Sequence, residues 1–218
     1  MSRGINLGGY RCIIFFLGLL TSSVTIASTV EKTRLITKEV AVDEQMLVEV
    51  LHERGQLEVE YYQGSNAVLT VNMIVRGDVE EDLDVLLSKY SLDINTNGQT
   101  VQIKSNTNIK SSNQVNAILY KRTKIRFSDG TFISSKIDDI KVNFNLKIPS
   151  VNKLDLTNKY HDIIVAYVPF HLSVTQFSSG IHIGDVGGDF ELHMKYGKGS
   201  VGQVQDANLE MFDSKIKM

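Results

Sequence analysis

The stretch LDLTNKYHDIIV at residues 154–165 returns as LSVTQFSSGIHI at residues 172–183, and this repetition decides the fold. Two further segments, LHMKYGKGSVGQV from Leu192 and LEMFDSKIKM from Leu209, follow the same order of leucine, polar residue, apolar residue and aromatic residue. The leading leucines at 154, 172, 192 and 209 thus recur at nearly equal steps. Near-constant spacing is typical of stacked coils, because the corners absorb insertions while the inward positions stay in register.

Each repeat also carries an aromatic residue ahead of its turn, namely Tyr160, Phe177, Tyr196 and Phe212. One coil alone is too small to bury its apolar edge, whereas stacked coils share one core. We therefore predict an all-β chain in which residues 150–218 form a β-solenoid with coils of about 17–20 residues. We expect the leading leucines in one interior column and the aromatic residues at recurring corners. A meander of antiparallel hairpins is the alternative, since it alternates equally well.

Residues 28–149 are predicted to form a strand-rich region. Segments such as LEVEYY at 57–62 alternate apolar and polar side chains, which is the pattern of a strand with one buried face. Residues 77–90 break this alternation, with acids in the first turn and leucines at 83, 86 and 87. This pattern predicts a short helix near 78–90. The polar stretch at 106–116 indicates a loop or a poorly ordered excursion.

The start of the chain, at 1–27, differs from the rest. Arg3 and Arg11 precede the apolar run CIIFFLGLL at 12–20, and small and polar residues follow up to Ala27. This order is typical of a secretory signal peptide, and we predict cleavage after Ala27. The apolar run is much shorter than the ~20 residues that a spanning helix needs. The mature chain is thus predicted to have no transmembrane helix and to be exported to the periplasm or the cell surface.

Composition excludes several classes of function. Cys12 is the only cysteine, and its removal with the signal peptide leaves no disulfide, no cysteine nucleophile and no thiolate metal ligand. Loss of Arg3 and Arg11 changes the formal net charge from -2 to -4. A mildly acidic chain is not expected to bind nucleic acid.

Two motifs raise the question of a metal site. His171, His182 and His193 are equally spaced, but strand alternation turns them outward on different parts of a coil, so we predict no metal and no cofactor. The segment GDVGGDF at 184–190 resembles calcium-binding repeats but occurs once. Its aspartates, at 185 and 189, are interpreted as turn residues beside glycines in left-handed conformations.

Charged clusters suggest two other sites. Lys121, Arg122, Lys124 and Arg126 form a basic stripe that could meet an acidic glycan or a lipid head group, although a solvated strand face is the favoured interpretation.

For catalysis, the leucine alignment predicts a row made of Asp155, Ser173, His193 and Glu210, with acids only at its ends. The sequence contains no Ser, His and Asp arrangement, no phosphate-binding glycine loop and no HExxH motif. No catalytic residue is predicted, and the protein is predicted not to be an enzyme.

The segments GQLEVEYYQGSNAVLTV, VNFNLKIPSVNKLDLTNKYHDIIV and KYGKGSVG resemble the "putative adhesin" family of exported bacterial β-solenoid proteins. This family is related to the head domain of autotransporter adhesins and is common in Bacteroidota. The resemblance covers residues 45–218 and implies the fold and a role in adhesion, but no defined site residues. Family members tend to continue through more coils. The end at SKIKM therefore predicts a truncated chain or a strand edge that pairs with another chain.

Together these features predict a non-enzymatic, exported cell-envelope or surface protein. It would act as an adhesin-like interaction module toward an envelope protein or a glycan. A polysaccharide-active β-helix enzyme and a periplasmic accessory of a signalling system are the alternatives.

Export provides a direct test of the predicted signal peptide. Expression of the full sequence in a Gram-negative host should yield an exported chain that begins at Ser28, measured by intact-mass spectrometry. Treatment with a thiol-alkylating reagent should leave its mass unchanged, because Cys12 has been removed. An exported chain that retains Cys12 would contradict the prediction.

Overall fold

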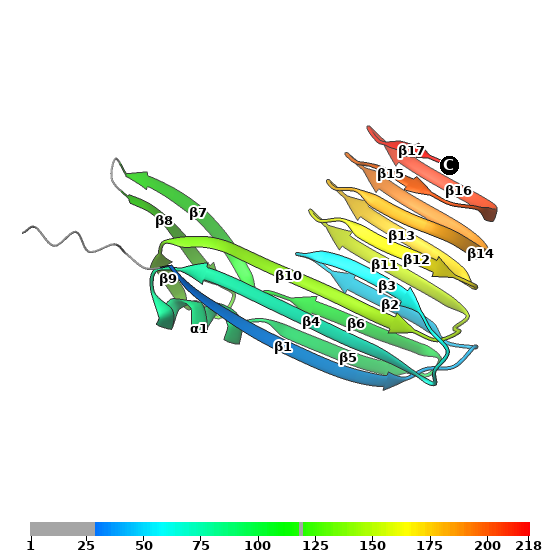
Figure 1. The fold of residues 1–218 in the computed structure, drawn as a ribbon, viewed down its shortest axis with the longest axis horizontal. Coiled ribbons are helices and arrows are strands. Elements are labelled where there is room, and N and C mark those ends of the chain that lie inside the picture. Colours follow the sequence, from blue (N-terminus) through cyan, green and yellow to red (C-terminus); the bar gives the residue numbers. More distant parts are fainter. Residues whose placement is uncertain (1–28, 118–119) are drawn as a thin grey trace, which may run out of the picture.

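The computed structural model describes residues 29–117 and 120–218, so the predicted signal peptide lies outside the described residues. The described chain consists of strands and one helix (Figure 1), which confirms the predicted all-β class. Most strands belong to one 14-stranded sheet in the order β1-β4-β10-β3-β12-β14-β13-β11-β2-β6-β5, with β15 and β16 paired to β14 and β17 paired to β15. A separate three-stranded sheet has the order β7-β8-β9.

The elements have the following bounds. The first half of the large sheet contains β1 (Val30–Ala41), β2 (Leu47–His52), β3 (Gln56–Tyr61), β4 (Asn66–Gly77), β5 (Ser91–Asn97), β6 (Thr100–Asn106) and β10 (Ile137–Ile148). The second half contains β11 (Lys153–Lys159), β12 (Ile163–Val168), β13 (His171–Phe177), β14 (Ile181–Lys195), β15 (Lys198–Val201), β16 (Val204–Phe212) and β17 (Lys215–Lys217). The small sheet contains β7 (Ile109–Ala117), β8 (Tyr120–Phe127) and β9 (Phe132–Ser135), and the helix is α1 (Glu80–Ser88).

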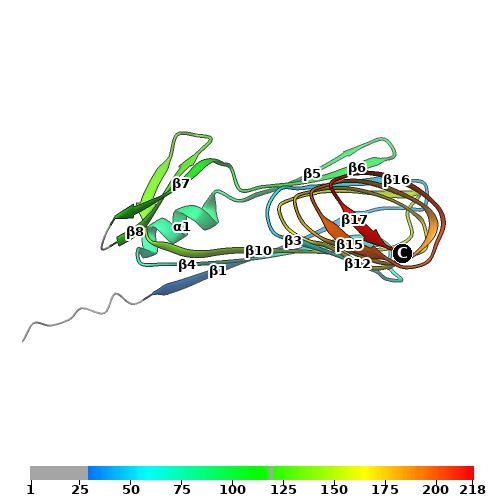
Figure 2. The same cartoon turned by 90° about the horizontal axis from the view of Figure 1, so that it is seen from above.

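Helix α1 lies between the long strands β1, β4 and β10 and the small sheet (Figure 2). Its buried residues are Leu83, Leu86 and Leu87, so the predicted helix and its apolar face are confirmed. Helix α1 is too short to cross a bilayer, and the described part of the chain contains no helix that could.

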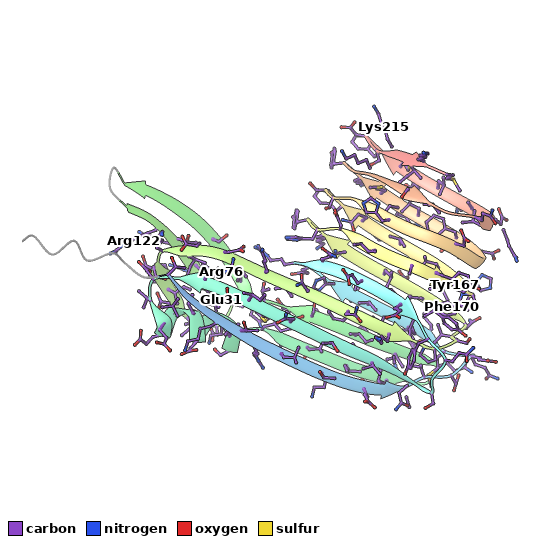
Figure 3. All side chains as sticks on the ribbon, viewed as in Figure 1. Glu31, Arg76, Arg122, Tyr167, Phe170 and Lys215 are labelled. Atoms are coloured by element: carbon purple, nitrogen blue, oxygen red, sulfur yellow. The ribbon has the colours of Figure 1, made fainter. Side chains whose placement is uncertain are left out.

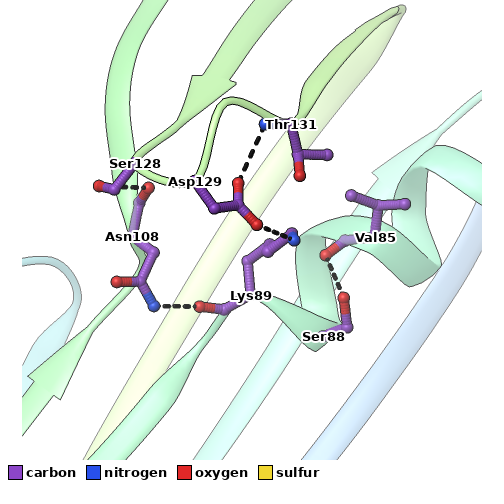
Figure 4. A network of polar contacts seen from close by, with 7 residues as sticks. All are labelled: Val85, Ser88, Lys89, Asn108, Ser128, Asp129 and Thr131. Carbon is purple, nitrogen blue, oxygen red and sulfur yellow. Dashed lines mark hydrogen bonds and ion pairs between the residues drawn. The ribbon is translucent and has the colours of Figure 1, made fainter.

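Polar contacts fix the small sheet to the end of α1 (Figure 4). The ammonium group of Lys89 donates a 2.5 Å hydrogen bond to the Asp129 carboxylate in the β8–β9 turn and lies 5.9 Å from the centroid of the Phe127 ring. The hydrogen bond from Lys89 lowers the pKa of Asp129 to about 2. The Asn108 side-chain amide donates a 2.6 Å hydrogen bond to the Lys89 carbonyl. Two contacts to Lys89, one from the β8–β9 turn and one from the residue that precedes β7, therefore join the small sheet to the end of the helix.

The predicted loop at 106–116 is wrong, because residues 109–117 form β7 and pair in antiparallel fashion with β8. Backbone hydrogen bonds to a partner strand do not depend on apolar alternation. A polar strand beside a basic one therefore leaves no periodic signal in the sequence.

The chain from β11 onward lies in parallel layers over β2 and β3 (Figure 1), and we call these layers the parallel stack. One side of the stack contains β2, β11, β13, the second half of β14, and β16. The other side contains β3, β12, the first half of β14, β15 and β17. Because β2 and β3 precede Pro149, the regions predicted on either side of this proline share one continuous sheet.

The predicted single column of leading leucines is wrong by two residues. Leu154 lies opposite Leu172, but the next partner of Leu172 is Phe190, whereas Leu192 lies opposite Val174. A shift of two residues keeps a side chain on the same face of a strand, so Leu192 is still fully buried. Two adjacent inward columns result. One contains Leu154, Leu172, Phe190 and Ala207, and the other contains Leu156, Val174, Leu192 and Leu209.

A third inward column is polar where the first coils turn. His52 lies opposite Asn158, which lies opposite Gln176, and all three side chains are buried. The Asn158 amide donates hydrogen bonds to the carbonyls of Gly55 at 3.2 Å and His161 at 2.9 Å, and Gln176 donates to the same His161 carbonyl at 2.9 Å. These amides satisfy carbonyls at the corner, where an unpaired buried group is costly.

The glycines of the segment 184–190 are not left-handed, contrary to the sequence interpretation, since the glycines with positive φ among the described residues are at 55, 98 and 130. These glycines are explained instead by the lack of room for a side chain. A Cβ atom on Gly184 would lie 1.6 Å from the Ala166 carbonyl oxygen, and one on Gly188 would lie 2.7 Å from the His171 nitrogen. The backbone of the neighbouring coil therefore excludes any side chain at these two positions.

Buried His52 predicts an acid-sensitive fold. Desolvation lowers the pKa of His52 from 6.5 to about 4, so the unfolded chain takes up a proton before the folded chain does. The free energy of unfolding should fall by about 3 kcal/mol as the pH drops from 7 to 4, in addition to other titrations. Urea unfolding across this range measures the effect. His52→Gln should remove this part of the pH dependence, and an unchanged slope in that variant would contradict the assignment.

Candidate functional site

One corner of the parallel stack repeats the same unusual backbone conformation. Non-glycine residues with left-handed φ occur at Tyr160 (67°), Ser178 (58°), Tyr196 (57°) and Asp213 (47°). Each follows the last residue of a strand, in a row formed by Lys159, Phe177, Lys195 and Phe212. Such φ values are uncommon outside glycine, so each coil holds its corner in the same costly geometry. The corner thus presents two neighbouring outward positions in every coil.

Aromatic side chains occupy these two positions alternately and form a continuous ladder of four rings. The ring centroids of Tyr160 and Phe177 are 5.8 Å apart, those of Phe177 and Tyr196 are 5.6 Å apart, and those of Tyr196 and Phe212 are 5.5 Å apart. The three interplanar angles are 88–90°, so every contact is edge to face. This is a favoured aromatic geometry. We call these four residues the aromatic ladder.

The aromatic ladder is exposed to solvent, with relative exposures from 36% to 57%. Exposure of four large rings in one row is unusual for a soluble surface, where apolar residues are normally scattered singly. The predicted aromatic corners are thus present, but their rings do not close over the core. They face outward as a row.

A groove of about 760 Å³ runs beside the ladder. Hydrogen-bonding groups line it together with three of the rings, among them Thr175, and His193 and Glu210, whose Nδ1 and carboxylate oxygen are 2.8 Å apart. The complete lining is Lys159, Tyr160, Thr175, Gln176, Phe177, His193, Met194, Lys195, Glu210, Met211 and Phe212. An apolar wall facing a few polar groups is the usual composition of a small-molecule or glycan site. The groove crosses successive coils, so a ligand in it would run along the stack and across the strands.

The predicted alignment of Asp155, Ser173, His193 and Glu210 in one row is wrong in its second half. The residues aligned with Asp155 and Ser173 are Glu191 and Asn208, whereas His193 and Glu210 continue the row of Thr157 and Thr175. The cause is the same two-residue error as for Leu192. His193 and Glu210 therefore border the aromatic groove, and Asp155 does not.

The corrected row brings two carboxylates into different environments. Burial raises the pKa of Asp155. A 2.7 Å hydrogen bond from the Lys153 ammonium lowers the pKa of Glu191. Ser173 lies between them, so the two acids are two strands apart, about 9.6 Å along the stack. Opposed pKa shifts in one row are a recognised feature of acid and base pairs, as well as of structural ion pairs.

The three histidines lie in three separate rows. The ring nitrogen of His171 accepts a 3.0 Å hydrogen bond from the Asp189 backbone, His182 lies 3.5 Å from the Ser200 hydroxyl, and His193 contacts Glu210. All three are exposed. Within residues 29–117 and 120–218, no group of three His, Cys, Asp or Glu side chains is placed to hold a metal ion.

The basic stripe lies on β8, far from the ladder. Figure 3 shows Arg122 on the small sheet and Lys215 on the opposite part of the molecule. Arg122, Lys124 and Arg126 are exposed, and the side chain of Lys121 lies outside the described residues.

No family model matches the sequence, and no curated protein matches it either. A "putative cell adhesion protein" from Clostridium sporogenes is similar in structure, with a TM-score of 0.49 and 10% identity over 85% of this chain and 98% of that one. A "putative adhesin" from Bacteroides fragilis gives 0.30 and 12% over 84% and 96%. A "putative lipid binding protein" from Parabacteroides distasonis gives 0.20 and 12% over 84% and 93%. Two of these names agree with the resemblance drawn from the sequence.

Sequence reasoning located the four aromatic residues but missed the groove. The spacing of the rings could be read from the sequence, whereas the contribution of Lys159 and Lys195 to the lining of the groove could not. Their alternation with Phe177 and Phe212 in a single row becomes visible only when the register between coils is known.

The ladder geometry predicts unequal contributions to stability. Phe177 contacts two rings and Phe212 contacts one, and each aromatic pair contributes about 0.5–1.5 kcal/mol beyond burial. Phe177→Leu should therefore lower the free energy of unfolding about twice as much as Phe212→Leu, by about 1–3 kcal/mol against about 0.5–1.5 kcal/mol. Chemical denaturation measures both. Equal losses would show that the rings do not act as a ladder.

Proposed function

We propose that this chain is an exported, non-enzymatic cell-envelope or surface protein that acts as an adhesin-like interaction module and binds a glycan along the aromatic ladder. The single observation that carries the proposal is the exposed row of four rings beside a groove lined with hydrogen-bonding groups. Aromatic rings provide large contact area for the C–H faces of sugars, and the polar lining residues offer partners for hydroxyl groups.

The finer fold belongs to the same proposal. We infer that residues 47–61 and 153–217 form a β-solenoid. The parallel register supports it, since Leu47 lies opposite Lys153 and Lys153 lies opposite His171. The later coils continue in parallel register, with Leu172 opposite Phe190 and Phe190 opposite Ala207. The inward columns of apolar residues thus run through the successive coils.

The spacing of the ladder favours an extended glycan over a compact ligand. Neighbouring coils are about 4.8 Å apart, so rings of one kind recur about every 9.6 Å. Tyr160 and Tyr196 are two coils apart, as are Phe177 and Phe212. This repeat is close to the length of a disaccharide in an extended chain, so successive units would meet equivalent surroundings.

One observation favours a second candidate, a polysaccharide-active enzyme. Asp155 and Glu191 lie in one outward row with their pKa values shifted in opposite directions. In inverting glycosidases the two carboxyl groups are ~6.5–9.5 Å apart. The ion pair of Glu191 with Lys153 is an equally direct reason for its low pKa, and for this reason binding without cleavage is our first choice.

The outer edges of β16 and β17 have no partner strand among the described residues. Pairing of this edge with another chain stays a prediction from the sequence. An accessory role in signalling has no feature of the described structure in its favour.

The test is a binding panel of soluble glycans, peptidoglycan fragments and lipopolysaccharide, measured by calorimetry with the exported chain. We expect saturable binding to at least one extended glycan, with Phe177→Leu/Tyr196→Leu weakening it about tenfold through two lost ring contacts. Tyr167→Leu is the matched control. Tyr167 is an exposed aromatic residue with an edge-to-face partner, Tyr61, and it lies outside the groove.

Circular dichroism of each variant separates lost binding from lost folding. Equal binding by the ladder variant and wild type would remove the ladder from the site. Release of shortened glycan by wild type, abolished in Asp155→Asn or Glu191→Gln, would establish the enzyme instead.

A further inference from the structure

The small sheet presents a one-sided basic surface. Along β8, Thr123, Ile125 and Phe127 are buried against the rest of the molecule, whereas the alternate residues Arg122, Lys124 and Arg126 all point outward. Residues two apart on a strand are separated by roughly 6.8 Å. Three cations therefore form a straight row on one face.

These cations are not neutralised within the described chain. None of the three forms an ion pair with a described residue. The acid in the adjoining turn, Asp129, is bound to Lys89. On β9, the residue opposite Lys124 is Ser134. The row is thus a local positive surface on a chain whose formal net charge is -2.

An exposed aromatic residue lies within the same surface. Phe132 on β9 is the register partner of Arg126, so both side chains leave the sheet on the same face, and Phe132 is 51% exposed. A soluble polyanion would bind the cations, but it would gain no binding free energy from an exposed phenyl ring. A lipid bilayer would engage both, because aromatic side chains favour the interface and cations favour anionic head groups.

We propose that the face formed by Arg122, Lys124, Arg126 and Phe132 docks on the surface of an anionic phospholipid membrane. The remainder of the acidic chain is repelled by such a surface, so the approach is oriented. Arg122 lies on the opposite part of the molecule from Lys215 (Figure 3), so docking through the small sheet leaves the end of the parallel stack at β17 distant from the docked face. This inference does not depend on the glycan proposal, because the two surfaces share no residue.

Vesicle co-sedimentation of the exported chain, with its N-terminus verified by mass, tests the proposal. Binding to vesicles of phosphatidylcholine with phosphatidylglycerol should exceed binding to pure phosphatidylcholine and should decrease with added salt. Arg122→Gln/Lys124→Gln/Arg126→Gln should weaken binding by roughly a hundredfold, since each cation near an anionic surface contributes roughly fivefold. Phe132→Ser should weaken binding at unchanged charge.

The matched control is Lys198→Gln/Lys215→Gln/Lys217→Gln, which removes the same charge from three exposed lysines at the other end of the molecule. It should retain wild-type binding. Equal losses in the two triple variants would overturn the proposal, as would charge-independent binding by wild type. Tight binding to soluble dextran sulfate, with Phe132→Ser behaving as wild type on vesicles, would reassign the face to a soluble polyanion. Circular dichroism confirms that each variant is folded.

Discussion

The parallel register between neighbouring coils is the constraint on which the rest of the structure depends. Leu154, Leu172 and Phe190 are buried because each is covered by its neighbours in the adjoining coils. None of these coils could bury its apolar side chains alone. The hydrogen bonds that set the register also place every outward side chain opposite its counterpart in the next coil. The same spacing between neighbouring coils therefore applies to the buried side chains and to the exposed ones.

The corner shows how one conformation serves two purposes. Inside it, Asn158 and Gln176 donate hydrogen bonds to the His161 carbonyl. Outside it, the left-handed residue directs an adjacent pair of side chains into solvent, and Tyr160 begins the row of rings there. Strained backbone is retained where surrounding contacts determine it. The buried amides provide those contacts in the first coils of the parallel stack.

Much of the architecture was readable from the sequence, because periodicity reports which face of a strand is buried. The leucines of α1 and the alternation at Leu57 and Val59 correctly indicated helix and strand. Register was less accessible. Because strands have a period of two, burial is equally consistent with Phe190 or Leu192 as the partner of Leu172, and the structure selects Phe190. The same ambiguity misplaced the row of candidate catalytic residues. Polar β7 was missed because pairing to β8 requires no apolar pattern.

The aromatic ladder has a geometric consequence for recognition. Its divisions are set by the main-chain spacing between strands, which side-chain substitutions do not change. The rings at Tyr160, Phe177, Tyr196 and Phe212 are therefore held at fixed distances from one another. A surface of this kind measures the period of a polymer more readily than the identity of any one unit. Selectivity would then reside in the repeat length of the ligand and tolerance in its chemical decoration.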